Sequence, residues 1–229
     1  MIPEFLSLPD RRLAYQRLRG GSGKAGVVFL GGYASDMTGT KAGFLAERCA
    51  GAGFSFLRFD YRGHGQSEGE FRDGMIGHWF DDACGVLDRL TEGPQILVGS
   101  SMGGWIGLML ARERPERVKA LIGIAAAPDF TEDLMWLRMT YEQRARLERD
   151  GEIPDPGAPS GTALPVTRRL IEDGRQHLLL RSPLEISCPV HLLQGQHDDE
   201  VPWQHALRIA ERITHDNVRV TWIMDGDHR

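Results

Sequence analysis

Residues 96–103 read Ile-Leu-Val-Gly-Ser-Ser-Met-Gly, so that an apolar run leads directly into a G-x-S-x-G motif at residues 99–103. A segment of helical character, Trp105 to Arg112, follows the motif. Between a strand and a helix, such a pentapeptide is typical of a nucleophile elbow, a sharp turn that leaves its central side chain projecting above the sheet. The stretch therefore predicts Ser101 as a nucleophile, whereas a plain turn rich in glycine and serine would carry no chemistry.

A serine nucleophile needs an acid and a histidine, and in this fold they follow the serine in that order. Three adjacent carboxylates, at residues 198–200, come soon after the apolar run 190–195. We favour Asp198 as the acid because it lies three residues after the end of that run. Asp199 stays open as the alternative.

The expected base is His228, which lies in a polar segment after the last apolar run of the chain, 218–224. His64 is the other histidine in a polar loop that suggests chemistry. It precedes Ser101, which is the wrong order for this arrangement. We therefore expect the triad Ser101, Asp198 and His228.

A pair of glycines, Gly31 and Gly32, ends the buried apolar run 27–30. Glycines at this point let the backbone approach a ligand closely. In a hydrolase of this kind the loop supplies one amide of the oxyanion hole, and the residue after the nucleophile supplies the other. We assign these amides to Tyr33 and Met102. The alternative is that the two glycines only make a tight turn.

Composition excludes several other classes of protein. The 229 residues suit one domain, and 41% hydrophobic and 26% charged residues are ordinary for a globular protein. A net charge of −5 without a basic cluster argues against a nucleic-acid partner. The three cysteines lack C-x-x-C spacing, which argues against disulfides and a zinc site. With no signal-like or membrane-spanning apolar stretch, we expect a cytoplasmic protein without a membrane span.

Strand and helix signals alternate along most of the chain, as in βαβ units with a parallel sheet. A hairpin is expected from the runs 5–8 and 13–18. The expected strands and helices then follow in the order 27–30, 40–51 (helix), 54–59, 75–90 (helix), 96–98, 105–112 (helix), 118–125, 190–195, 203–213 (helix) and 218–224. The prediction is an α/β fold with helices on both faces of a mostly parallel central sheet.

The alternation breaks between residues 128 and 183. Helices are expected over 131–149 and 166–180, separated by a segment with four prolines. An insertion at this point, after the strand that follows the elbow helix, would lie over the carboxyl edge of the sheet. We therefore expect residues 1–127 and 184–229 to form the core and residues 128–183 to form a lid. The alternative is that the apolar side chains around Trp136 simply pack the insertion on the core.

The whole pattern resembles the α/β-hydrolase family, and within it the branch of α/β-hydrolase domain-containing protein 10, which contains acyl-glucuronide esterases and palmitoyl-protein thioesterases. The residues that carry the resemblance are Gly32-Tyr33, Met37 to Ala42, Phe59-Asp60-Tyr61, Gly93 to Trp105, Ala120 to Gly123, Asp198 to Trp203 and Asp227-His228-Arg229. The stretch from Gly93 to Trp105 is the most specific of these. In this family the chain continues past the histidine into a final helix, and we expect neither that helix nor a mitochondrial leader within residues 1–229.

The resemblance implies hydrolysis of a small-molecule acyl ester or thioester through an acyl-enzyme intermediate. Ser101, Asp198 and His228 would form the triad, Tyr33 and Met102 would donate to the oxyanion, and no cofactor or metal is required. Peptidases and C–C hydrolases of the same fold remain alternatives. A third alternative is a non-catalytic binding or scaffold protein that keeps the fold. The sequence does not define residues that bind the substrate or an oligomeric state.

Overall fold

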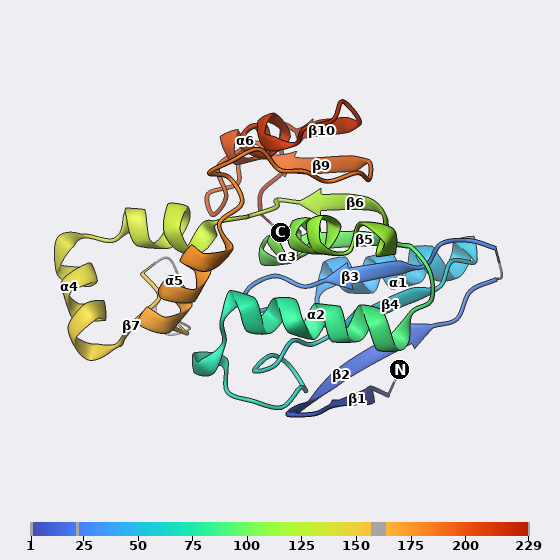
Figure 1. Ribbon diagram of the computed structural model, residues 1–229, viewed down its shortest axis with the longest axis horizontal. Coiled ribbons are helices and arrows are strands. Elements are labelled where there is room, and N and C mark those ends of the chain that lie inside the picture. Colours follow the sequence, from blue (N-terminus) through green and yellow to red (C-terminus); the bar gives the residue numbers. More distant parts are fainter. Residues whose placement is uncertain (1, 22, 157–163, 229) are drawn as a thin grey trace.

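The computed structural model describes residues 2–21, 23–156 and 164–228. Its centre is an eight-stranded sheet in the order β1-β2-β4-β3-β5-β6-β9-β10 (Figure 1). The strands β1 and β2 pair with each other in antiparallel fashion, β2 pairs antiparallel with β4, and the other neighbours are parallel. The strands are β1 (Glu4–Leu8), β2 (Arg11–Leu18), β3 (Val27–Leu30), β4 (Phe56–Phe59), β5 (Gln95–Ser100), β6 (Val118–Ile124), β9 (Val190–Gly195) and β10 (Val218–Ile223). The expected mostly parallel sheet with an N-terminal hairpin is confirmed.

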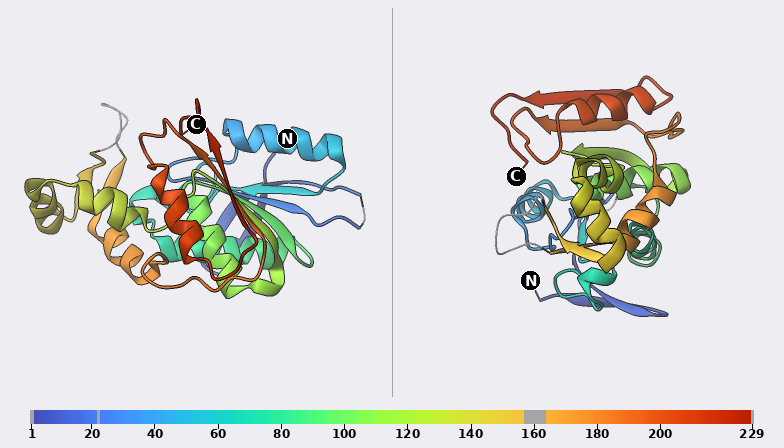
Figure 2. Two further views of the ribbon diagram at one scale, coloured as in Figure 1. Left: turned by 90° about the horizontal axis from the view of Figure 1, so that it is seen from above. Right: turned by 90° about the vertical axis from the view of Figure 1, so that its left-hand side faces the viewer.

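Helices cover both faces of this sheet, as predicted (Figure 2). On β3, Val27 and Phe29 pack in one cluster with Ala42 and Cys49 of α1 (Thr40–Ala52). The alternate residues Val28 and Leu30 belong to the larger cluster on the other face. That cluster includes side chains of four helices, namely α2 (Ile76–Leu90), α3 (Met102–Glu113), α5 (Arg168–Gly174) and α6 (Gln204–Arg212). A strand buried on both faces reads as a continuous apolar run because neither set of alternate positions meets water.

The segment between β6 and β9 projects from the carboxyl ends of the strands, where α4, β7 and α5 are labelled in Figure 1. It contains a π-helical turn (Thr131–Met135), a 3-10 turn (Trp136–Arg138), α4 (Tyr141–Asp150), β7 (Glu152–Pro154), β8 (Pro165–Thr167), α5 (Arg168–Gly174) and a 3-10 turn (Arg175–His177). Further 3-10 turns lie at Phe71–Asp73 and Pro115–Arg117. Residues 157–163 of the expected lid lie outside the described residues.

Both helices expected in this segment are corrected by the structure. The helix expected over 131–149 is interrupted at Met139, and α4 starts anew because Thr140 and Gln143 form a capping box. The helix expected over 166–180 starts only at Arg168, since Thr167 caps it and β8 pairs with β7. The chain then leaves α5 after Gly174. Local capping and strand pairing thus override the helical periodicity of these runs.

None of the helices in the described ranges is long and apolar enough to cross a membrane.

Candidate active site

Ser101 occupies the turn between β5 and α3. Its φ of 52° and ψ of −117° place it in a region that residues with a Cβ rarely adopt. Backbone contacts hold this conformation: the Ser101 amide donates to the Ile124 carbonyl at 2.9 Å, and the Ser101 carbonyl accepts from the amides of Gly104 and Ala127 at 2.9 and 3.0 Å. The strained turn expected of a nucleophile elbow is therefore present, and neighbouring backbone supports it.

The flanking glycines are required by close packing around this turn. A Cβ on Gly103 would lie 2.0 Å from the Leu30 carbonyl oxygen, and one on Gly99 would lie 2.3 Å from the Gly103 carbonyl oxygen. Real side chains do not occupy such distances without backbone shifts. The G-x-S-x-G pattern thus reflects the close approach of α3 to the ends of β3 and β5.

The loop after β3 lies against Ser101. A Cβ on Gly32 would lie 3.4 Å from both the Ser101 Cβ and the Ser100 carbonyl oxygen. Met102 is the first residue of α3, so its amide has no acceptor within the helix. Within the described part of the chain, the Tyr33 amide has no hydrogen-bond acceptor either. Two amides without a protein acceptor next to a serine are the arrangement that an oxyanion hole requires.

The structure joins Asp198 and His228, which are 30 residues apart in the chain: His228 Nδ1 lies 2.9 Å from Asp198 Oδ2. The other carboxylate oxygen of Asp198 accepts from the amides of Val201 and Glu200 at 2.7 and 3.0 Å. Gln194 Nε2 also donates to Oδ2 at 3.2 Å. Each carboxylate oxygen of Asp198 thus has two protein donors, and Asp199 beside it is exposed.

These contacts decide the charge of Asp198. Burial by itself raises the pKa of this carboxyl, but the hydrogen bonds from His228, Val201 and Glu200 outweigh burial and bring the pKa below its usual 3.8. The side chain is therefore an anion at neutral pH. A buried anion on Nδ1 keeps the proton of a neutral imidazole on that nitrogen and leaves Nε2 to act as a base.

Ser101 and His228 are not hydrogen-bonded to each other among the described residues. His228 Nε2 instead lies 3.5 Å from Glu200 Oε2, and the Glu200 side chain is 55% exposed. Hydrogen bonds between a nucleophile and its base are often long without substrate and tighten when it binds. Sequence reasoning did not anticipate this contact of Glu200 with the imidazole.

His64 supports the loop after β3 and does not join the Asp198–His228 pair. Its Nε2 accepts from the Ala34 amide at 3.2 Å, while Nδ1 contacts the Arg62 carbonyl at 3.2 Å. Burial lowers the pKa of His64 below its usual 6.5. A neutral imidazole with its proton on Nδ1 satisfies both contacts. The expectation that His64 is not the base agrees with this placement.

Asp60, at the end of β4, supports the same loop. Its carboxylate accepts from the amides of Met37 at 2.6 Å and Gln66 at 2.8 Å. Gly65 (φ 48°) is required beside it, because a Cβ there would lie 2.2 Å from Asp60 Oδ2. Sequence analysis placed Asp60 in a family motif without a role. A carboxylate directly after a buried strand was the signal for such a contact.

Comparison with known proteins identifies the family of this chain. Residues 21–150 match the family model described as serine aminopeptidase, S33. The palmitoyl-protein thioesterase ABHD10, mitochondrial, of Bos taurus is 40% identical over 227 residues, which are 98% of this chain and 73% of the relative. The chain belongs to the α/β-hydrolase family.

Solved structures share the fold of this hydrolase over its full length. The α/β-hydrolase domain-containing protein 10 from mouse has a TM-score of 0.90 and 40% identity, over 100% of this chain and 91% of that one. A crystal structure of a protein from Agrobacterium vitis S4 has a TM-score of 0.92 and 40% identity, over 99% of this chain and 90% of that one. The expected fold class and the resemblance to the α/β-hydrolase family are both confirmed.

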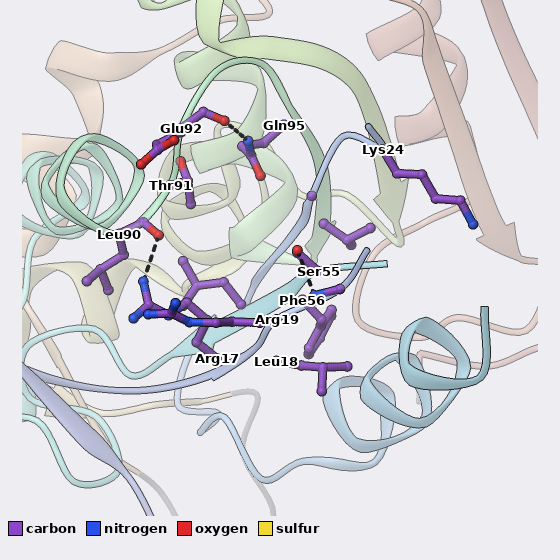
Figure 3. Close-up of a pocket in the computed structure, with 14 residues that line it drawn as sticks. Arg17, Leu18, Arg19, Lys24, Ser55, Phe56, Leu90, Thr91, Glu92 and Gln95 are labelled. Atoms are coloured by element: carbon purple, nitrogen blue, oxygen red, sulfur yellow. Dashed lines mark hydrogen bonds between the residues drawn. The ribbon is translucent and has the colours of Figure 1, made fainter. Parts of the chain in front are cut away.

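The hydrolase also has a cavity of about 350 Å³ at the opposite edge of its sheet (Figure 3). The cavity lies where β3, β4 and β5 begin, whereas Ser101 follows the end of β5. The two ends of β5, a strand of 6 residues, lie roughly 20 Å apart. Arg17 and Gln95, which line the cavity, donate to backbone carbonyls of Leu90 and Glu92. The cavity is therefore remote from the elbow and does not belong to the candidate site.

Proposed function

We propose that the hydrolase cleaves carboxylic esters or thioesters through an acyl-enzyme intermediate, with Ser101, Asp198 and His228 as its triad. The observation that carries this proposal is the hydrogen bond of 2.9 Å between Asp198 and His228 in a fold whose elbow holds Ser101 at a φ of 52°. An acid hydrogen-bonded to a histidine enables the histidine to take the proton of a serine nucleophile. The strained elbow supports the serine as that partner.

The proposed reaction needs no group beyond the chain and water. His228 Nε2 takes the proton of Ser101 as Oγ attacks the acyl carbon, and the carbonyl oxygen becomes an oxyanion held by the amides of Tyr33 and Met102. The imidazolium, stabilised by Asp198, then protonates the leaving alcohol or thiol as its bond to the acyl carbon breaks. Water, deprotonated by His228, attacks the acyl-enzyme, and Ser101 recovers its proton.

We include thioesters among the proposed substrates because similar proteins are described as thioesterases. The bovine and mouse ABHD10 proteins are described as palmitoyl-protein thioesterases, and they are 40% and 42% identical to this chain. Identity at this level over 98% and 95% of the chain supports a shared reaction type. It leaves the acyl group and the leaving group open, because pocket shape decides them.

We also propose that residues 128–183 act as a lid. Phe130, at the start of this segment, packs against Tyr33 and Trp105 with ring centroids 5.5 and 5.7 Å away. Arg138 from the same segment donates to the Glu200 carbonyl at 3.3 Å. The segment thus contacts the loop of Tyr33 and the loop of the acid, the two sides of the candidate site. This position suits a cover over bound acyl groups.

A peptidase is the second candidate function, favoured by the description of the matching family model as a serine aminopeptidase. The same triad chemistry serves amides, esters and C–C bonds, so the triad does not discriminate among them. A non-catalytic scaffold is the third alternative. A strained elbow and a fully hydrogen-bonded Asp198 have no use in a scaffold, and they argue against it.

Substrate profiling tests the proposal. The wild-type chain and Ser101→Ala are assayed with p-nitrophenyl esters, acyl thioesters and aminoacyl amides of matched size. We expect ester and thioester turnover in the wild type, and a loss of about 10³-fold or more in Ser101→Ala. Turnover confined to aminoacyl amides would favour the peptidase. Absence of turnover on all three classes would favour the scaffold.

A cytoplasmic location is a separate proposal. It rests on Cys49, Cys84 and Cys188, which are free thiols. Disulfides are frequent in oxidising compartments and rare in the cytosol. Fractionation of the native cells with an antibody against the chain tests it, and recovery outside the cytosolic fraction would contradict it.

A further inference from the structure

Lys41 makes a direct contact with the backbone of His228. Its Nζ donates to the His228 carbonyl oxygen at 2.8 Å, across 187 residues of sequence. Lys41 lies in the first turn of α1, on the face of the sheet that α1 covers. Both views of Figure 2 show the last segment of the chain returning from β10 towards the start of this helix. The contact therefore joins the segment that carries His228 to α1, the helix that follows the loop of Gly32 and Tyr33 (the oxyanion loop).

The place of Lys41 in its helix is unfavourable for a cation. The first turn of a helix carries the positive end of the macrodipole, which favours acidic side chains and disfavours lysine. The first turn of α1 contains no acidic residue that would offset this charge. Lys41 therefore does not stabilise α1 by its charge, and its contact with His228 supplies a different reason for its position.

Backbone hydrogen bonds also hold the segment that leads to His228. The His197 amide donates to the Gly226 carbonyl and the Gln196 amide donates to the Ile223 carbonyl, both at 2.9 Å. Asp198 holds the imidazole of His228 at Nδ1, and Lys41 holds the backbone of the same residue at its carbonyl oxygen. The position of Nε2 therefore depends on both contacts.

The same helix is coupled to the oxyanion loop. The loop of Tyr33 leads directly into α1, and Asp60 holds it through the Met37 amide at 2.6 Å. We propose that Lys41 is a positioning residue that sets His228 relative to Ser101 and to the oxyanion amides. This inference rests on the proposed function, because positioning the base matters only if His228 acts on Ser101. Lys41 itself does not touch the reacting atoms.

The test compares three variants of the full chain. Lys41→Met removes the donor, Lys41→Arg keeps a donor and the charge, and Lys24→Met is the matched control. Lys24 Nζ donates to the Ala52 carbonyl at the same distance, 2.8 Å, at the other end of α1. The readouts are the rate at which a fluorophosphonate labels Ser101, kcat and KM for an ester, and the melting temperature.

We expect the fluorophosphonate to label Ser101 about ten- to a hundredfold more slowly in Lys41→Met than in the wild type, since small displacements of a catalytic group have effects of this size. The kcat of this variant should fall by the same factor with KM unchanged. Lys41→Arg should recover part of the labelling rate. Lys24→Met should be labelled at the wild-type rate, although its melting temperature should shift as much as that of Lys41→Met. Labelling of Lys41→Met at the wild-type rate would overturn the proposal.

A second measurement separates this proposal from the proposed function. The proton on His228 Nδ1, hydrogen-bonded to Asp198, gives a downfield NMR signal that does not depend on Ser101. We expect this signal to broaden in Lys41→Met and to stay sharp in Lys24→Met. If Ser101 of the wild type is not labelled, the proposed function fails, and the NMR comparison still decides whether Lys41 holds His228. An unchanged signal in Lys41→Met would contradict that role.

Discussion

Asp198 accepts a hydrogen bond of 2.9 Å from His228 Nδ1, and its neighbour Asp199 is exposed to solvent. Two carboxylates that are adjacent in sequence thus have different surroundings. The amides of Glu200 and Val201 turn Asp198 inward, since both donate to its Oδ1. Of these two carboxylates, only that of Asp198 contacts the imidazole.

The two carboxylates should differ sharply on substitution. We expect Asp198→Asn to reduce kcat by about 10³- to 10⁴-fold, because the amide no longer fixes the tautomer of His228. Asp199→Asn is the matched control and should keep the wild-type kcat. The check is ester hydrolysis at neutral pH with both variants. A larger loss in Asp199→Asn would transfer the role of acid to that residue.

His64 should make stability depend on pH in the acid range. Burial holds its pKa below the usual 6.5 in the folded chain, so below about pH 6.5 the unfolded chain binds a proton that the folded chain does not. Stability therefore falls as the pH decreases towards the folded pKa. Protonation also removes the acceptor of the Ala34 amide.

Denaturant unfolding at about pH 7.5 and about pH 5.5 measures this effect. The unfolding free energy should fall less between these two pH values in His64→Gln than in the wild type, because the variant has no imidazole to protonate on unfolding. The exposed His197 provides the control, and His197→Gln should follow the wild type. Equal losses in His64→Gln and wild type would contradict the buried neutral state of His64.

Gly65 and Gly93 allow the support of the oxyanion loop to be tested. Both have positive φ, 48° and 64°, but a Cβ on Gly65 would meet Asp60 Oδ2 at 2.2 Å and one on Gly93 would meet nothing within 4 Å. Gly93→Ala should lower the unfolding free energy by about 1–2 kcal/mol through backbone strain alone. Gly65→Ala should lower it by about 1–3 kcal/mol more through overpacking. Only Gly65→Ala should also reduce kcat. Equal changes of kcat in the two variants would exclude a role of Asp60 in supporting the oxyanion loop.

Asp129 should be essential for the junction after β6. Its carboxylate accepts from the amides of Leu179 and Leu180 at 2.7 and 2.9 Å, and its φ is 62°. Asp129→Ala leaves two buried amides without an acceptor and should cost about 2–4 kcal/mol of unfolding free energy. Asp129→Asn keeps one acceptor and tolerates the backbone conformation, so it should cost less. Equal losses in the two variants would show that these hydrogen bonds do not stabilise the junction.

The sheet and the elbow could be predicted because their signals are local. Val27–Leu30 is a continuous apolar run since the structure buries both sides of β3. The glycines of residues 99–103 are present because the backbones of β3, β5 and α3 come close together. Such constraints leave their trace within a few residues of the feature they specify.

The segment 128–183 and the supports of the site could not be predicted in the same way. The interruption at Met139 depends on the capping box of Thr140, which competes with an apolar periodicity that continues past it. His64 and Lys41 obtain their contacts from residues 30 and 187 positions away. The sequence around them shows a polar loop and a helix start, and only the folded chain supplies their partners.

Mass-spectrometric mapping of a fluorophosphonate adduct on the 229-residue chain shows directly whether Ser101 is an activated nucleophile. This probe reacts with a serine only when a base activates its hydroxyl. We expect a single adduct on Ser101, which is lost in Ser101→Ala and forms much more slowly in Asp198→Asn. An adduct on another residue, or no adduct on the folded chain, would contradict the assignment of Ser101 as a nucleophile activated by His228.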